Sequence, residues 1–323
     1  MIPSQVWRAR RDAHEARADA LVADHRARSR RGERHAVEDF LFTYYAHRPA
    51  QLRRWSPGWG VVLEDAAPHD LGRHGVAVEG GAALAPPPDR VVRAAAWTAS
   101  LLRRSGERRA RYDCFGLHEW AMVHRTPHSE VRHAGLPLRL GEEATTALVE
   151  ALPLRCTHFD AFRFFAPSAA TLNATALSRD AVLEHEQPGC LHAGMDLYKW
   201  AYRLSPWVPG ELVLDAFAHA RRTRELDMRA SPYDVSRYGL APVEVESEAG
   251  RAEYAAAQRA LAREAAPLRA RLLAAADAVA QNTAEQSGST SPRSAREAAA
   301  SAPARCSTTR PAAASDSSVV PPR

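Results

Sequence analysis

The sequence contains a single lysine, Lys199, among 43 lysine and arginine residues, and a single isoleucine, Ile2. Such scarcity is typical of a coding bias against A/T-rich codons and carries no functional meaning by itself. It does provide a yardstick, because a residue that the bias disfavours needs a reason to be kept. Lys199 lies between Tyr198 and Trp200, although lysine is rarely buried without a partner. This one lysine therefore marks a candidate functional segment.

Cysteine and long apolar runs are scarce as well. The four cysteines do not resemble the disulfide framework of a secreted protein; they are Cys114, Cys156, Cys190 and Cys306. No apolar run approaches the ~18 residues that a membrane-spanning helix needs. The charged N-terminal segment also lacks the apolar region of a signal peptide. We therefore expect a reduced, cytoplasmic protein without a membrane span.

Several motifs that would assign the chain to a large enzyme class are missing. The chain has no GxGxxG or GxxxxGK[ST] phosphate loop and no GxSxG nucleophile elbow, so neither nucleotide-binding nor α/β-hydrolase chemistry is indicated. The formal net charge of +5 is mildly basic. This charge is compatible with a nucleic-acid partner without requiring one. The sequence does not indicate an oligomeric state.

Helical patterns dominate the rest of the chain. An Ala/Arg-rich segment at 4–31 has strong helix propensity and no internal Gly or Pro, and apolar residues recur at helical spacing over about 254–279. Further helices are predicted at about 37–45, 90–104, 113–124, 141–152, 178–186 and 209–228. Short β-branched runs between Gly and Pro at 56–88 predict a small hairpin or sheet, and residues 123–140 predict a second hairpin.

The expected architecture is mainly α, a single compact helical domain over 1–282 with a minor β hairpin or sheet element. From 283 to 323 the chain is rich in Ser, Thr, Ala and Pro without an apolar period, so we expect a disordered tail. The basic helix at 4–31 is expected to be a solvated helix with i,i+4 ion pairs. The alternative is an arm that lies on phosphates.

Three histidines each follow a cysteine closely and precede a carboxylate, in the segments CFGLHEW, CTHFD and CLHAGMD. Cys, His and carboxylate side chains are the usual ligands of zinc and other first-row metals, although these spacings match no standard zinc motif. The alternative is that the cysteines are small buried hydrophobes and the histidines are satisfied polar groups. The candidate zinc ligands are His118, His158 and His192, with Cys114, Cys156 and Cys190 as further candidates.

The same segments place carboxylates beside aromatic rings. A carboxylate against an apolar ring can have a raised pKa and act as an acid or a base. A lysine in such a wall can have a lowered pKa and act as a nucleophile. Arginine cannot replace a lysine in that role; the alternatives are a plain Asp196–Lys199 ion pair on a helix face, or chance. The candidate catalytic residues are Asp196, Asp160, Lys199 and Glu119.

A further charged segment, RELDMRASPYDVSRYGL, occupies residues 224–240. Its arginines and aspartates are expected to form a salt-bridge network, with an anion clamp as the alternative. The residues concerned are Arg224, Asp227, Arg229, Asp234 and Arg237.

Five stretches carry a resemblance to a known family: VEDFLFTYYAHRPAQLRRW, CFGLHEWAMVHR, LRCTHFDAFRFF, EQPGCLHAGMDLYKWAYRL and RELDMRASPYDVSRYG. In these stretches the chain resembles an actinobacterial family commonly labelled 3-methyladenine DNA glycosylase, and the resemblance covers about residues 5–275. It implies a DNA-repair enzyme that excises alkylated purines from DNA with damaged bases. The Leu-x-Gly-x-Gly turn of helix-hairpin-helix glycosylases does not occur in the chain.

Base excision requires that the damaged base be flipped from the duplex and stacked on aromatic rings, and that a carboxylate stabilise an oxocarbenium-like sugar. The candidate stacking residues are Trp120, Tyr198 and Trp200, with Asp160 or Asp196 as the carboxylate. Two other functions stay open. One is a metal-dependent hydrolase that acts on a small substrate through the Cys/His/carboxylate segments, and the other is a nucleic-acid-binding protein without enzymatic activity.

Overall fold

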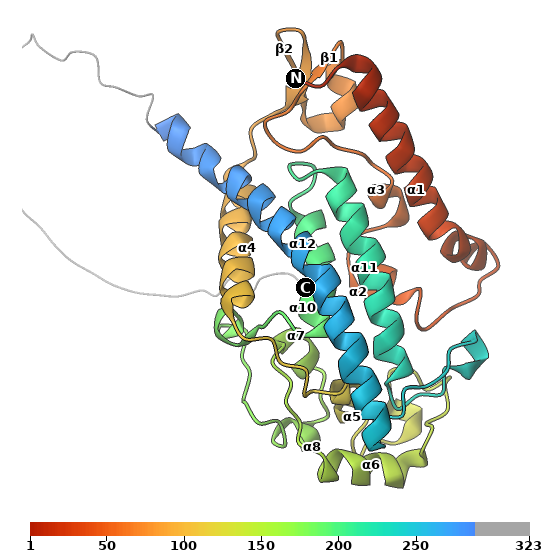
Figure 1. Ribbon diagram of the computed structural model, residues 1–323. Helices are drawn as coiled ribbons and strands as arrows, with labels where there is room; N and C mark the ends of the chain where they lie inside the picture. Colours follow the sequence, from red (N-terminus) through yellow and green to blue (C-terminus); the bar gives the residue numbers. More distant parts are fainter. Residues whose placement is uncertain (288–323) are drawn as a thin grey trace, which may run out of the picture.

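A computed structural model describes residues 1–287, and four long helices form the body of the molecule (Figure 1). They are α4 (Asp89–Glu107), α10 (Leu191–Arg203), α11 (Gly210–Arg229) and α12 (Glu248–Ser287). Helix α12 crosses α4, α10 and α11, and α10 packs along α11. Nearly every residue of α10 is buried, so the segment that contains the lysine is the central helix of the body. The prediction of a mainly α fold with a minor β element is confirmed.

Helix α1 (Ser4–Arg30) lies against α11 and against α3 (Pro49–Leu52). Its buried side is narrow and includes Trp7, Ala18 and Val22. Four of its seven arginines pair with other elements; Arg10, for example, lies 2.8 Å from Glu211 of α11. About half of the positive charge of this predicted basic helix is therefore used in holding it to the body of the protein.

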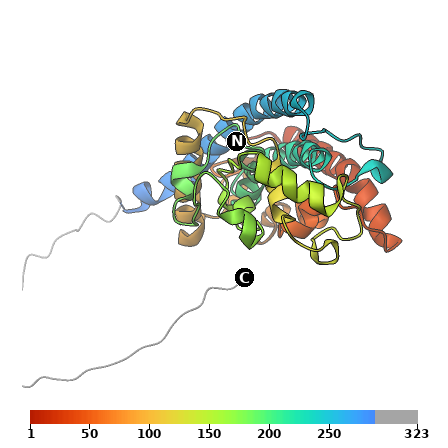
Figure 2. The same ribbon diagram turned by 90° about the horizontal axis from the view of Figure 1, so that it is seen from below.

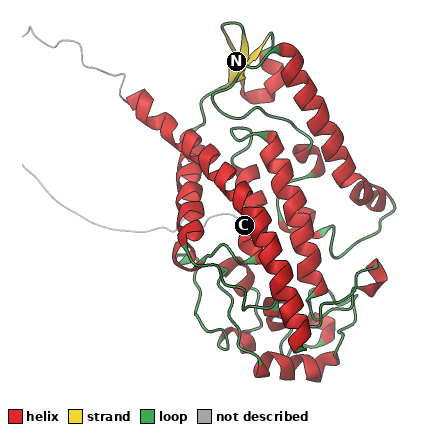
Figure 3. Cartoon of the chain, viewed as in Figure 1, coloured by secondary structure: helices red, strands yellow, loops and turns green. Residues whose placement is uncertain are grey.

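The β element is a three-stranded antiparallel sheet at the N-terminal end of the molecule (Figure 3). Its strands are β1 (Val62–Glu64), β2 (Gly75–Val78) and β3 (Gly81–Leu84), and their order in the sheet is β1-β3-β2. The 3-10 helix η1 (Pro68–His74) connects β1 to β2 in the sequence. Leu63 pairs with Ala82, and both are fully buried against the core. The predicted sheet at 56–88 is thus confirmed.

Short helices joined by loops fill the opposite end of the molecule, which is nearest the viewer in Figure 2. They are α5 (Leu117–Met122), α6 (Gly141–Ala151), α7 (Phe159–Phe162), α8 (Pro167–Ala170) and α9 (Val182–His185). Their core includes Trp120, Val149 and Tyr254, the last from α12. This end therefore rests on the same long helices as the rest of the protein.

Several predicted elements differ from the structure. Helix α2 (Phe40–Tyr44) and α9 are single turns rather than the longer helices predicted. The predicted hairpin at 123–140 is wrong, because the segment holds only the 3-10 helix η2 (His128–Glu130) and one isolated bridge, from Leu138 to Tyr233. A further 3-10 helix, η3, spans Ser236–Tyr238.

Two further predictions concern the C-terminal boundary of the domain and the absence of a membrane-spanning helix. Helix α12 continues to Ser287, beyond the domain boundary predicted at 282, and the rest of the predicted tail lies outside the described residues. No helix between residues 1 and 287 combines the length and apolar character needed to cross a membrane.

Candidate metal centre

The structure brings together three histidines that are far apart in the sequence. His118 lies in α5, His158 immediately precedes α7, and His192 lies in the first turn of α10. The ring centroid of His192 is 4.4 Å from that of His118 and 5.4 Å from that of His158. All three imidazoles therefore meet at the end of the central helix, between the long helices and the short ones.

His118 and His192 form a first triad with Asp227 of α11. One possible ligand atom from each of the three lies within 4.8 Å of the other two. His118 Nε2 is 2.8 Å from Asp227 Oδ1, and both side chains are buried. Two imidazoles and one carboxylate are a ligand set found for divalent zinc and iron.

Asp227 is oriented by Arg224, one helical turn before it. The Arg224 guanidinium donates from Nη1 to Asp227 Oδ2 at 2.5 Å and to Glu119 Oε1 at 2.6 Å. Because Oδ2 is taken by Arg224, the other oxygen of Asp227 faces His118. Glu119, a predicted catalytic carboxylate, is therefore an ion-pair partner of Arg224 and belongs to neither metal-capable group.

Two buried atoms of the first triad pair only with each other. His118 Nε2 and Asp227 Oδ1 lie 2.8 Å apart as an ion pair whose angles are poor for a hydrogen bond, and neither has another partner among residues 1–287. Buried polar atoms nearly always have a partner, and here each of the two depends on the other. A metal ion bound beside both atoms would take the place of the proton that they share.

The protonation states suit a cation at the first triad. Burial, helped by the neighbouring charge of His118, lowers the pKa of His192 to about 3, so His192 is neutral with a free lone pair at neutral pH. Burial alone would raise the pKa of Asp227, but His118 and Arg224 outweigh it and hold that pKa below its usual range. Asp227 and His192 thus present an ionised carboxylate and a neutral imidazole, and a metal ion that binds here also has to displace the proton of His118.

A second triad consists of His158, Asp160 and Asp196, again with ligand atoms within 4.8 Å of one another. Lys199 fills it. Its Nζ donates to Asp196 Oδ2 at 2.5 Å and to Asp160 Oδ2 at 2.8 Å. Tyr45 donates its hydroxyl to Asp196 Oδ1 at 2.8 Å. The predicted Asp196–Lys199 pair therefore exists and is extended to a second carboxylate.

Lys199 and His158 are both cations in this arrangement. Burial would lower the pKa of Lys199, but Asp196 and Asp160 outweigh it and raise that pKa. Burial likewise opposes the charge on His158, whereas hydrogen bonds to Asp196 and Glu186 raise its pKa to about 9. The expectation of a lysine with a lowered pKa, ready to act as a nucleophile, is wrong for this reason.

The predicted stacking residues are not available to a flipped base. Trp120 is fully buried and donates its Nε1–H to the Ala230 carbonyl at 2.8 Å. Tyr198 is fully buried, with its hydroxyl 2.8 Å from His47 Nδ1. Trp200 is 7% exposed and lies under the Lys199 ammonium, with Nζ 4.3 Å from the ring centroid. These rings belong to the core, which is the commonest place for aromatic side chains.

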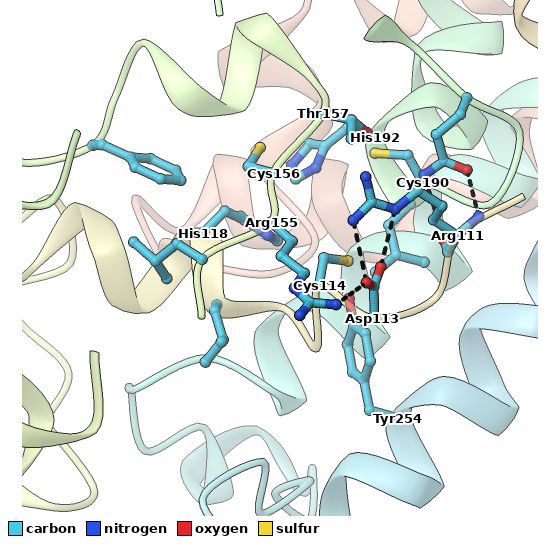
Figure 4. A pocket seen from close by; sticks show the side chains of 15 residues that line it. Arg111, Asp113, Cys114, His118, Arg155, Cys156, Thr157, Cys190, His192 and Tyr254 are labelled. Atoms are coloured by element: carbon cyan, nitrogen blue, oxygen red, sulfur yellow. Dashed lines mark hydrogen bonds and ion pairs between the residues drawn. The ribbon is translucent and has the colours of Figure 1, made fainter. Parts of the chain in front are cut away.

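A small cavity reaches the first triad from outside (Figure 4). His118 and His192 form part of its wall together with Cys114, Cys156 and Cys190. Its interior volume is about 20 Å³, room for about one water molecule.

Three charged side chains form the outer rim of this cavity. Arg111 and Arg155 both pair with Asp113, at 3.2 and 2.6 Å. About a third to a half of each side chain is exposed, in contrast to the buried imidazoles beneath.

The cysteines line this cavity without joining a metal-capable group among the described residues. Burial raises the pKa of the Cys156 thiol to about 12 and raises the pKa values of Cys114 and Cys190 as well. Without a metal these thiols are therefore protonated at neutral pH. The three cysteines, which the sequence offers as further candidate ligands, thus line the same cavity as His118 and His192.

Sequence reasoning missed two contributors. Asp227 was expected only in a salt-bridge network, and Glu186, whose Oε2 is 3.1 Å from His158 Nδ1, was not singled out. The spacing of Arg224 and Asp227 was a usable signal, because it places an acid and a base three residues apart on a helix, as Asp196 and Lys199 are placed on α10. Asp227 could not be assigned to His118 before α11 was positioned, nor Glu186 to His158 before the end of α9 was positioned.

Comparison with protein-family models, with curated proteins and with solved structures finds no match for this chain.

Proposed function

We propose that the protein is a divalent-metal-dependent hydrolase that acts on a small substrate, with His118, His192 and Asp227 as the metal ligands. One observation carries the proposal: His118, His192 and Asp227, from three different helices, each place a possible ligand atom within 4.8 Å of the other two. A bound zinc ion, the first candidate, would polarise a substrate oxygen and lower the pKa of a bound water.

The surrounding residues have roles that do not depend on which metal binds. Arg224 holds one oxygen of Asp227, which fixes the direction of the other, as partners of metal ligands commonly do. The neutral state of His192 leaves a lone pair free. The charged His158, stacked at 5.4 Å from His192, keeps a proton near the triad at neutral pH.

The cavity limits the substrate. A volume of about 20 Å³ next to the two imidazoles admits a water molecule and little else. A substrate therefore has to present its reacting group from the rim formed by Arg111, Asp113 and Arg155. The two arginines on that rim favour a reacting group that carries negative charge.

Metal analysis tests this proposal directly. We expect about one zinc ion per chain by elemental analysis, and a Co²⁺-substituted protein should show the visible absorption of a low-coordinate cobalt site. The variants His118→Ala, His192→Ala and Asp227→Asn should lose both signals, whereas the exposed His69→Ala should keep them. A folded wild-type protein that binds neither zinc nor Co²⁺ at micromolar concentration would rule out the proposal.

Hydrolysis is assayed with p-nitrophenyl acetate, p-nitrophenyl phosphate and bis(p-nitrophenyl) phosphate. We expect turnover of at least one ester, loss of that turnover on chelation, and recovery when zinc is restored. Turnover that persists in Asp227→Asn would show that the triad does not carry it.

A second candidate function is an N-glycosylase that acts on alkylated DNA, and an open groove favours it. The groove has a volume of about 920 Å³, and its lining includes Phe40, His133 and three arginines. These arginines are Arg34, Arg132 and Arg237, and none of them forms an ion pair among residues 1–287. Unpaired arginines beside aromatic rings are typical of surfaces that bind nucleic-acid phosphates and bases.

No triad residue lines the groove, but side chains of its lining contact neighbours of both triads. Arg224, which holds Asp227, lies 3.9 Å above the Phe40 ring in its lining. Arg132 lies over Phe40 at 5.2 Å and over Phe164 at 5.9 Å, and Phe164 follows Arg163, the ion-pair partner of Asp160. Phe164 is 39% exposed. It is the ring that could take the stacking role of the buried tryptophans.

This second function makes a different prediction from the first. Duplex DNA should bind with an affinity that falls steeply with salt, and Arg132→Gln and Arg237→Gln should each lower the salt slope by about 1. Arg93→Gln, an exposed and unpaired arginine on α4, is the matched control. Release of 3-methyladenine from methylated duplex in the presence of a chelator would favour the glycosylase, and DNA binding without salt dependence would exclude it.

A further inference from the structure

The two triads differ in where their own cation lies. In the first triad, Arg224 binds Asp227 Oδ2, so Oδ1 is left toward His118 Nε2. In the second triad, Lys199 binds Asp196 Oδ2, which is also the oxygen that lies 3.4 Å from His158 Nε2. Arg224 thus stands behind its carboxylate, whereas the Lys199 ammonium stands among the atoms that could bind a metal.

The remaining oxygens of the second triad are used from the outside. Asp196 Oδ1 accepts the hydroxyl of Tyr45 at 2.8 Å, and Asp160 Oδ1 lies 3.0 Å from Arg163 Nε. Each carboxylate is therefore held from behind and presents its other oxygen, Oδ2, to the centre. This is the arrangement expected of metal-binding carboxylates, except that the centre holds Nζ of Lys199.

We infer that Lys199 is a built-in substitute for a metal ion, so that the protein binds one ion at the first triad and carries a fixed ammonium where a second ion would bind. The inference rests on the proposed metal site at the first triad. The new site is the second triad, whose carboxylate and imidazole ligands suit a divalent cation. In the wild-type chain Lys199 occupies this site and prevents a metal ion from binding.

The chemistry of the ammonium group explains why arginine does not replace this one lysine. An ammonium is a compact point charge that can lie between two carboxylate oxygens, at 2.5 and 2.8 Å here, as a small cation does. A guanidinium is a planar fork and needs more space. The Trp200 ring beneath the ammonium, at 4.3 Å, adds a cation–π contact that favours a poorly hydrated charge. A fixed ammonium, unlike an ion, cannot be lost to a chelator.

Metal stoichiometry distinguishes this role from an ordinary ion pair. Metal-free protein is titrated with zinc and, separately, with Co²⁺, and the bound ions are counted. We expect one ion per wild-type chain and two per Lys199→Ala chain. The double variant Lys199→Ala/Asp196→Asn should return to one. Arg163→Gln, which removes the cation from the outer oxygen of Asp160, is the matched control and should bind one.

Each outcome of this titration is decisive. A wild-type chain that binds no ion overturns the proposed function and not merely the inference. A wild-type chain with one ion and a folded Lys199→Ala chain with one ion overturns the inference alone.

Removal of Lys199 leaves buried carboxylates without a partner, so Lys199→Ala could unfold when metal-free. In that event we expect zinc to restore its folding, with a larger increase in Tm than in the wild type, and no such restoration in the double variant. Lys199→Ala that stays unfolded at saturating zinc would show that an ion cannot take the place of the ammonium, and would also overturn the inference.

Discussion

At the scale of single residues, Asp227 connects the proposed metal site to the stability of the protein. Its two oxygens face two different groups, His118 on one side and Arg224 on the other. Arg224 is itself buried, and Glu119 is its second partner. A change at position 227 therefore affects a ligand and the partner of a buried charge together, whereas a change at Glu119 affects the partner alone.

This difference gives a paired prediction. Asp227→Asn is expected to abolish binding of one Co²⁺ ion and to lower the free energy of unfolding by about 3–5 kcal/mol, because it leaves a buried guanidinium poorly compensated. Glu119→Gln should also destabilise the protein but keep the Co²⁺ spectrum. Urea unfolding of the metal-free proteins and cobalt titration measure the two effects. Equal loss of cobalt binding in both variants would contradict the assignment of Asp227 as the ligand.

His47 makes the stability of the fold depend on pH. Burial lowers its pKa to about 4, and its Nδ1 lies 2.8 Å from the Tyr198 hydroxyl. Above the unfolded pKa, near 6.5, His47 is neutral in both states and the protein has its full stability. As the pH falls from about 6.5 toward 4, the unfolded state binds a proton that the folded state does not, so the free energy of unfolding decreases.

We expect this one group to remove about 3 kcal/mol of stability between pH 6.5 and pH 4. Urea unfolding at pH 7 and at pH 4.5 measures the effect. His47→Gln should lose less stability than the wild type between these two pH values. The exposed His69→Gln should show the wild-type dependence. An unchanged pH dependence in His47→Gln would show that His47 is not the responsible group.

At the scale of elements, the position of α5 depends on the glycine before it. Gly116 has a φ of +71°, and a Cβ there would come within 3.1 Å of the Tyr254 ring and 3.3 Å of Ala230. The left-handed backbone and the close contact with α12 both favour glycine. Since α5 begins at the next residue, Gly116 sets where His118 lies.

Gly116→Ala is therefore expected to lower the free energy of unfolding by about 1–3 kcal/mol and to weaken Co²⁺ binding, because α5 must shift. Gly141→Ala is the matched control. Gly141 has nearly the same φ, +72°, but no atom lies within 4 Å of its added Cβ. It should show a smaller loss of stability and unchanged cobalt affinity. Weakened cobalt binding in both variants would point to a general effect of backbone strain.

The elements also show how far sequence patterns predict this protein. Long amphipathic segments such as α4 and α12 were predictable because their apolar period is repeated over several turns. The single-turn helices α2 and α9 were predicted too long, because propensity does not show where a loop must turn to meet the core. The false hairpin at 123–140 has a related cause, since its valines and leucines pack into a small core with Tyr233 and Met228 rather than pairing as strands.

In the candidate site, too, local pairs could be predicted from the sequence, whereas contacts set by tertiary packing could not. The local pair of Asp196 and Lys199 could be predicted from helical spacing alone. The meeting of His118, His158 and His192 could be proposed but not established, because each lies on a different short element whose position depends on tertiary packing. Burial of Trp120 and Tyr198 could not be predicted either, since an aromatic residue beside a polar one occurs both in sites and in cores.

At the scale of the whole molecule, the long helices connect regions that might otherwise unfold separately. Helix α12 contributes Tyr254 to the core of the loop-rich end, and Ala276 and Val279 to the main core. Helix α10 likewise carries Leu191 into the first of these cores and Trp200 into the second. The first triad lies beside the core of the loop-rich end, to which Leu117, Leu191 and Leu226, the chain neighbours of its three residues, belong.

We therefore expect a single cooperative thermal transition that shifts as a whole when a metal binds. At a free zinc concentration of about 100 times Kd, the added stability is about 2.7 kcal/mol, which corresponds to an increase in Tm of roughly 4–5 °C for a chain of this size. Differential scanning calorimetry with and without zinc measures it. Two transitions, only one of which responds to zinc, would show that the two ends unfold independently.

The rim of the cavity above the first triad has a consequence for exchange rates. Arg111, Asp113 and Arg155 hold one another across the opening by exposed, hydrogen-bonded ion pairs, and attraction between exposed charges weakens as dissolved salt screens it. The imidazoles and the carboxylate below are buried and are screened far less. Raising the ionic strength should therefore shorten the dwell time of whatever the cavity encloses, while the equilibrium preference of the buried groups for it changes little.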